Sequence, residues 1–149
     1  MKTWTITKEV NVSIDKVWDV IDGSEENLKN LDPKIISQET LIVTEERVGS
    51  KYLQKYKEGK KVMEYEVVVT DYNETDYEKM FAIGFNLGGW FDIAVRYELE
   101  KIDENKTIIK YTTTNKPLKF LAKVMMKFMP GGDNMLEKHI KKIEELAKI

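Results

Sequence analysis

The sequence of 149 residues contains no cysteine and only one histidine. Without cysteine the chain cannot form disulfide bonds, thiolate metal sites or a cysteine nucleophile. One histidine and no cysteine also argue against a structural or catalytic zinc site. No apolar run approaches the roughly 18 residues that a membrane-spanning helix needs. We therefore expect no metal, no other cofactor and no transmembrane segment.

The sequence also has little net charge. Its 24 lysines and arginines nearly balance its 26 aspartates and glutamates, which gives a formal charge of −2. A general nucleic-acid-binding protein normally carries a basic excess, so we do not expect that function. The first ten residues, MKTWTITKEV, alternate polar and apolar side chains and lack the apolar segment of a signal peptide. The expected location is therefore the cytoplasm.

The chain is expected to form a single domain over residues 1–149, because it has no low-complexity tract, long linker or repeat. Apolar residues alternate from Lys2 to Val12, which predicts a half-buried strand. Two short helices are predicted next. The first begins after Ser13 and ends at Gly23, and the second runs from Ser24 to Leu31.

Six further strands are predicted from apolar residues that recur at every second position between short turn sequences. The clearest segment is WFDIAVRYELEKI, in which Phe91, Ile93 and Val95 share one face with Tyr97 and Leu99. Short turns between successive strands predict an antiparallel meander with one covered face. The predicted strands span residues 36–46, 51–57, 61–71, 77–85, 90–102 and 107–114.

A long helical pattern closes the chain from Lys116 to Ile149 and is interrupted only at Pro130-Gly131-Gly132. It is the only predicted helix long enough to cover the apolar face of a curved sheet. The fold class is therefore α+β. The interruption is either a simple bend that follows the sheet or a hinge that gates a cavity.

This order of elements resembles the START and birch-pollen-allergen superfamily, also called the polyketide cyclase/dehydrase and lipid transport (SRPBCC) superfamily. The resemblance covers the whole chain. It includes VSIDKVWDVIDG, which is similar to the small-residue–x–x–x–Val–Trp opening of the family's first helix. The resemblance implies a helix-grip fold, in which a curved antiparallel sheet of about seven strands wraps a long C-terminal helix, with two short helices after the first strand. It also implies a cavity between sheet and helix, where members commonly hold lipids, sterols, polyketides or other hydrophobic small molecules.

Apolar residues cover roughly two-thirds of the C-terminal helix before Pro130, more than contact with a sheet requires. The extra face needs a second contact: the two short helices, a ligand, a second subunit or a membrane surface. Methionine adapts to irregular apolar ligands, although it also serves as ordinary core filler. Inward-facing tyrosine and threonine hydroxyls would either orient a ligand or bond to the backbone. The predicted ligand-binding residues are Tyr65, Val67, Phe91, Ile93, Val95, Tyr97, Tyr111, Thr113, Leu121, Met125 and Met129.

We expect the cavity to bind or transport a hydrophobic small molecule rather than to catalyse a reaction. The alternatives are a cyclase/dehydrase-type enzyme that uses the same cavity and a protein-interaction domain with little cavity. His139, the only histidine, has no recognisable Ser-His-Asp partners in the sequence. Lysines at positions 116, 119, 123 and 127 form one stripe of the C-terminal helix, which suits transient contact with a membrane surface or is simply a solvated face.

Overall fold

The computed structural model describes residues 1–22, 24–127 and 133–149. Within them, seven strands form one antiparallel sheet in the spatial order β1-β7-β6-β5-β4-β3-β2. The strands are β1 (Lys2–Val10), β2 (Ile35–Ile42), β3 (Lys51–Glu58), β4 (Lys61–Glu74), β5 (Glu78–Leu87), β6 (Phe91–Asp103) and β7 (Lys106–Pro117). The helices are α1 (Ile14–Ile21), α2 (Glu25–Leu31), α3 (Phe120–Lys127) and α4 (Asp133–Ala147).

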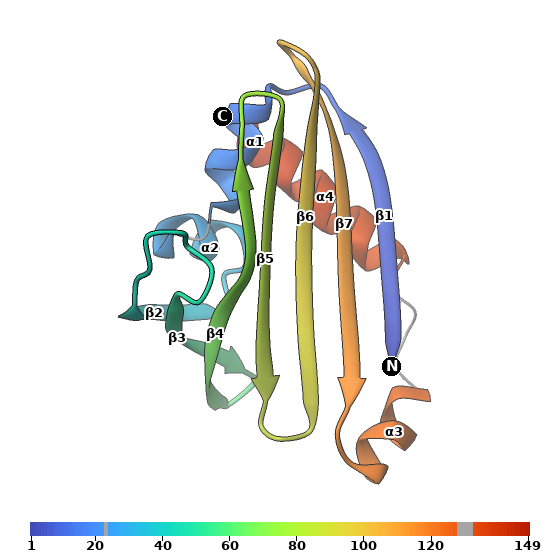
Figure 1. Cartoon of the computed structure of the whole chain (residues 1–149). Helices are drawn as coiled ribbons and strands as arrows, with labels where there is room; N and C mark the ends of the chain where they lie inside the picture. The colour runs from blue at the N-terminus through green and yellow to red at the C-terminus, as the bar shows by residue number, and fades with distance from the viewer. Residues whose placement is uncertain (23, 128–132) are drawn as a thin grey trace.

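The sheet confirms the predicted meander, since β2 to β7 lie side by side in chain order. The N-terminal strand β1 closes the other edge by pairing with β7. Helix α4 crosses one face of this sheet behind β6, β7 and β1, and α1 and α2 lie on the same side (Figure 1). The α+β class and the helix-grip arrangement predicted from the sequence are thus confirmed.

Helix α1 forms because its apolar residues recur at helical spacing and its first turn is capped. Ser13 accepts a hydrogen bond from the backbone N–H of Lys16 at 3.3 Å. Ile14, Val17 and Trp18 are buried together with Ile21, the positions that the sequence pattern predicted. This apolar face packs against α4 and the sheet, so the main core lies between the sheet and these two helices.

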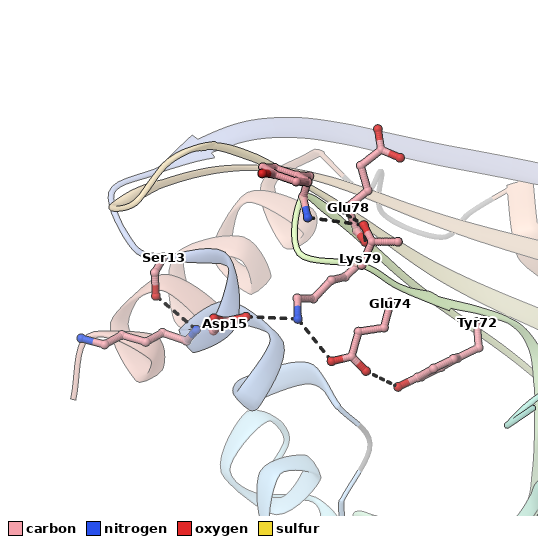
Figure 2. Close-up of polar contacts among 9 residues, drawn as sticks. Ser13, Asp15, Tyr72, Glu74, Glu78 and Lys79 are labelled. Atoms are coloured by element: carbon pink, nitrogen blue, oxygen red, sulfur yellow. Dashed lines mark hydrogen bonds and ion pairs between the residues drawn. The ribbon is translucent and has the colours of Figure 1, made fainter. Parts of the chain in front are cut away.

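A buried lysine holds α1 against the sheet (Figure 2). The Lys79 Nζ on β5 lies 3.1 Å from Asp15 Oδ1 on α1 and 3.2 Å from Glu74 Oε1 on β4. It also lies 5.8 Å from the centre of the Trp18 ring. Burial lowers the pKa of Lys79, but the hydrogen bonds and charges of Asp15 and Glu74 more than offset this, so the pKa is raised. The charged lysine therefore bridges a helix and two strands at one end of the sheet.

The C-terminal helix departs from the prediction in its first part. Lys116 and Pro117 are the end of β7, paired with Asp92 and Phe91 of β6, because the β6–β7 ladder continues past the predicted end of the strand. Helix α3 is a separate element that lies at the far end of the sheet from α1 (Figure 1). Of the predicted C-terminal helix, the described part that packs across the sheet is α4. The predicted bend or gate at Pro130-Gly131-Gly132 lies outside the described residues.

Replacement of one buried isoleucine of α4 should strongly destabilise the fold. Ile143 is fully buried, whereas Ile149 is 99% exposed. Ile143→Ala should lower the free energy of unfolding by about 2–5 kcal/mol, because it removes buried methyl groups and leaves a cavity. Urea unfolding followed by circular dichroism measures this loss. Ile149→Ala is the control and should change the value by less than about 0.5 kcal/mol. Similar effects of the two variants would contradict the packing described for α4.

Candidate functional site

A cavity of about 560 Å³ lies between the concave face of the sheet and the helices α2 and α4. This volume lies within the range of roughly 300–1,000 Å³ that is usual for small-molecule sites. Most of the lining is aliphatic or aromatic. The lining residues are Ile21, Leu28, Leu31, Asp32, Ile35, Gln54, Tyr56, Glu58, Met63, Tyr65, Phe81, Ile83, Phe85, Leu87, Ile93, Val95, Tyr97, Tyr111 and His139.

Strand periodicity explains why the central strands present an apolar wall. Side chains of a strand alternate between the two faces, and paired residues of neighbouring strands share a face. Ile83 pairs with Val95, and Phe85 pairs with Ile93, so both pairs point to the concave side. The wall of the cavity is therefore built by alternate residues of β5 and β6.

Three rings form a polar group in this apolar wall. Tyr97 on β6 and Tyr111 on β7 are cross-strand partners, and their rings stack with centroids 4.9 Å apart. The Oη of Tyr97 lies 2.7 Å from Nε2 of His139 on α4. The imidazole ring also lies 4.7 Å from the Tyr111 ring. Helix α4 thus brings the only histidine to two tyrosines that are distant in sequence.

Burial keeps these three groups uncharged at neutral pH. It lowers the pKa of His139 to about 4 and raises the pKa of Tyr111 to about 12. Burial, and next to it Tyr111, raises the pKa of Tyr97 well above its ordinary value. A neutral imidazole and a phenol can exchange donor and acceptor roles, so either the phenol donates to Nε2 or the Nε2–H donates to the phenol oxygen.

A second polar group lies on β3 and β4. The Tyr65 hydroxyl donates to Oε1 of Gln54 at 2.8 Å, and the Gln54 amide donates to Oε1 of Gln38 at 3.1 Å. The Tyr65 ring stacks on Phe85 with centroids 4.7 Å apart. Burial raises the pKa of Tyr65, so this phenol also stays protonated. Its hydroxyl is already engaged within the protein.

The charges of the lining are all of one sign. Asp32 and Glu58 contribute carboxylates, and the part of the lining that the structure describes includes no lysine or arginine. Glu58 is exposed and Asp32 is half-buried, so both carboxylates retain access to water. The described lining therefore contributes two carboxylates and no cation, and a lysine beside it, Lys34, lies 6.0 Å from the centre of the Tyr56 ring.

Five of the predicted ligand-binding residues line this cavity, namely Tyr65, Ile93, Val95, Tyr97 and Tyr111. Val67 and Thr113 lie on the same face of the sheet, paired with Phe85 and Val95, but they do not reach the lining.

The other predicted residues lie elsewhere. Phe91 is buried in a separate cluster with Ala122 and Met126 of α3. Leu121 and Met125 are 61% and 51% exposed, because α3 packs at the end of the sheet instead of across it. The structure therefore does not bring these two residues to the cavity. Met129 lies outside the described residues.

Some lining residues were missed although the sequence carries a signal for them. Phe81, Ile83 and Phe85 alternate along β5 in the same way as the predicted residues of β6. His139 lies three residues after Leu136 and four before Ile143, which places it on the buried side of α4. Helical spacing alone therefore predicts that His139 lies on the buried side. The contact between His139 and Tyr97 could not be predicted in this way, since 42 residues separate the two.

No group of three or more histidine, aspartate or glutamate side chains in the described ranges lies close enough to hold a metal ion. Across residues 1–22, 24–127 and 133–149, none of the helices has the length and apolarity to cross a bilayer.

Comparisons with solved structures give strong likenesses of fold at low sequence identity. Norcoclaurine synthase from Thalictrum flavum, in complex with dopamine and hydroxybenzaldehyde, is 17% identical with a TM-score of 0.66; the match covers 97% of this chain and 85% of that one. Human STARD10 is 13% identical with a TM-score of 0.75, over 97% of this chain and 62% of that one. The di-domain ARO/CYC protein BexL from the BE-7585A biosynthetic pathway is 6% identical with a TM-score of 0.70, over 99% and 47%. No model of a protein family and no curated protein matches the sequence.

The depressed pKa of His139 predicts a pH dependence of stability. In the unfolded chain an imidazole takes up a proton near pH 6.5, whereas in the folded chain His139 does so only near pH 4. Between these values the unfolded state binds more protons, so the free energy of unfolding falls as the pH is lowered from 6.5 to 4. The loss amounts to roughly 3 kcal/mol.

The variant His139→Gln isolates this contribution, because the carboxylates that titrate in the same range remain in both proteins. Urea unfolding at pH 7, 5.5 and 4.5 should show a smaller loss on acidification for the variant. Equal losses in the two proteins would mean that His139 is not held neutral by burial.

Proposed function

We propose that this chain, which has the helix-grip fold of the START and birch-pollen-allergen superfamily, binds an uncharged hydrophobic small molecule in the cavity between sheet and helices. The superfamily resemblance seen in the sequence is confirmed at the level of the fold. The observation that carries the proposal is the cavity of about 560 Å³ with its mainly apolar lining. Burying apolar surface in such a site supplies about 25 cal/mol per Å².

The polar groups of the lining support an uncharged ligand. A buried carboxylate or phosphate without a cation nearby is strongly unfavourable. The lining carries Asp32 and Glu58 and, in its described part, no cation, so an anionic ligand such as a fatty acid would be repelled by two carboxylates, while Lys34 lies outside the lining beside Tyr56. A hydroxyl or carbonyl group on the ligand can instead exchange hydrogen bonds with the Tyr97–His139 pair, which lies in the cavity wall.

An enzyme that uses the same cavity is the competing candidate, and Tyr97 and His139 are the groups that would transfer protons. Proton transfer is most effective when the pKa of the catalytic group lies near the working pH. The pKa of His139 is about 4 and that of Tyr97 is well above 10. Neither pKa therefore lies near pH 7. These values favour hydrogen bonding to a neutral ligand over acid–base catalysis.

Filling the cavity should weaken ligand binding. Val95 lines the cavity, whereas Val62 is 59% exposed on β4. The variant Val95→Trp should bind the neutral probe Nile red at least about tenfold more weakly, because the indole occupies the space of the ligand. Fluorescence titration measures this change, and Val62→Trp should bind as the original protein does. Unchanged binding by Val95→Trp would show that the probe binds outside the cavity.

Because the described lining contains no lysine or arginine, the cavity should prefer an uncharged ligand to an anionic one of the same chain length. Decanol should displace Nile red at a concentration at least about tenfold lower than decanoate does at pH 8, since only the carboxylate carries a charge into the cavity. Tyr97→Phe should weaken decanol about fivefold through the loss of one hydrogen bond, and should leave Nile red nearly unchanged. If decanoate competes as well as decanol, an uncharged ligand is excluded as the preferred class.

A further inference from the structure

Helix α3 lies at the end of the sheet (Figure 1), and several of its apolar side chains are exposed. Phe120 is 78% exposed, Leu121 61%, Met125 51% and Val124 37%. We name these four residues the α3 surface. The helix has only eight residues, so half of its side chains belong to this surface. Water contact of this extent on so short a helix is unfavourable unless another apolar phase covers it.

The opposite side of α3 anchors it to the sheet. Ala122 and Met126 are buried against Phe91, and the Nζ of Lys2 on β1 donates to the backbone carbonyl of Met126 at 3.0 Å. The α3 surface is therefore presented outward by a helix that is fixed at its base. It spans roughly 140° of the helix circumference at about 100° per residue.

Lysines occupy the remaining sector of the helix. Lys123 and Lys127 on α3, and Lys119 directly before it, follow one another at four-residue spacing and lie between the anchoring side and the α3 surface. All three are exposed, and none forms an ion pair within the part of the chain that the structure describes. Lys119 instead lies over the Trp90 ring, 5.1 Å from its centre.

The surrounding sequence has the same bias. From Lys116 to Lys127 there are four lysines and no aspartate or glutamate, although the whole chain has a net charge of −2. Across the sheet, Lys116 is paired with Asp92, whose carboxylate accepts a hydrogen bond from Asn86 at 2.9 Å. Positive charge is thus concentrated around the exposed apolar surface.

We propose that the α3 surface docks on an anionic lipid bilayer. A helix that lies in the interface inserts its apolar side chains among the acyl chains and extends lysines to the headgroups. Anionic headgroups supply the complementary charge to Lys119, Lys123 and Lys127. A wide, convex apolar face suits the continuous apolar phase of a bilayer better than a protein groove, which receives a narrower stripe.

The docked helix would adjoin the cavity. Ile93 lines the cavity and also packs against the cluster of Phe91, Ala122 and Met126 that anchors α3. The bilayer would therefore meet the protein next to the cavity wall. Docking itself does not depend on the proposed ligand, so each proposal can fail without the other.

The experiment measures co-sedimentation of the full chain with vesicles in 50 mM salt. Vesicles of phosphatidylcholine alone are compared with vesicles containing about 30% phosphatidylglycerol. Partitioning to the anionic vesicles should exceed that to the neutral ones at least about tenfold, and should fall when the salt is raised to 500 mM.

Two variants test the surface itself. Phe120→Ser combined with Met125→Ser should lower partitioning about tenfold or more, and so should the triple variant in which Lys119, Lys123 and Lys127 become glutamine. The control for the triple variant changes Lys106, Lys138 and Lys141 to glutamine, which removes the same charge from exposed sites elsewhere on the chain. Circular dichroism and thermal unfolding establish that each variant is folded.

Three outcomes overturn the proposal. The first is no partitioning to anionic vesicles at low salt. The second is partitioning that the α3 variants leave unchanged or that the control variant reduces equally. The third is a concentration-dependent dimer in analytical ultracentrifugation that Phe120→Ser with Met125→Ser abolishes, since a second copy would then cover the α3 surface.

Discussion

The sheet has one apolar face to bury, and the helices are too short to cover it. Strand β4 has 14 residues and spans roughly 45 Å, whereas α4 has 15 residues and spans only about 22 Å. Helix α4 and the shorter α1 therefore cover only part of the concave face. At that end the buried Lys79 ties α1 to β4 and β5, and the core is closed. The cavity lies over the part of the strands that the helices do not cover. The difference in length between strands and helices thus accounts for both the core and the cavity.

The Tyr97–His139 pair lies at the boundary between these two regions. On α4, Leu136, Ile140 and Ile143 face the core, while His139 on the same helix lines the cavity. Burial at this boundary is the main cause of the altered pKa of each group, and it makes both groups uncharged. Burial thus explains why this polar site can bind a neutral group, and why the pKa values of its side chains are far from those that favour proton transfer near pH 7.

Strand periodicity predicted the part of the site that lies on the sheet, because parity alone decides which face a residue occupies. That is why Ile93, Val95 and Tyr97 were identified from the sequence. Helical periodicity predicted that residues around Leu121 are helical, but it does not specify which element a helix packs against. The place where the chain leaves the sheet and α3 begins depends on the length of the β6–β7 ladder, a tertiary feature. The partner of His139 is likewise set by the topology.

If α3 docks on a bilayer as proposed, its position links the cavity to that bilayer. An apolar ligand that leaves a protein through water loses about 0.8 kcal/mol for each methylene group, or roughly 8 kcal/mol for a chain of ten. Direct passage into an adjoining bilayer avoids this barrier. Ile93 belongs both to the cavity wall and to the cluster beneath α3, so the two regions share a side chain. If both proposals hold, apolar residues exposed on α3 lower the barrier to ligand exchange, because the ligand meets no aqueous step.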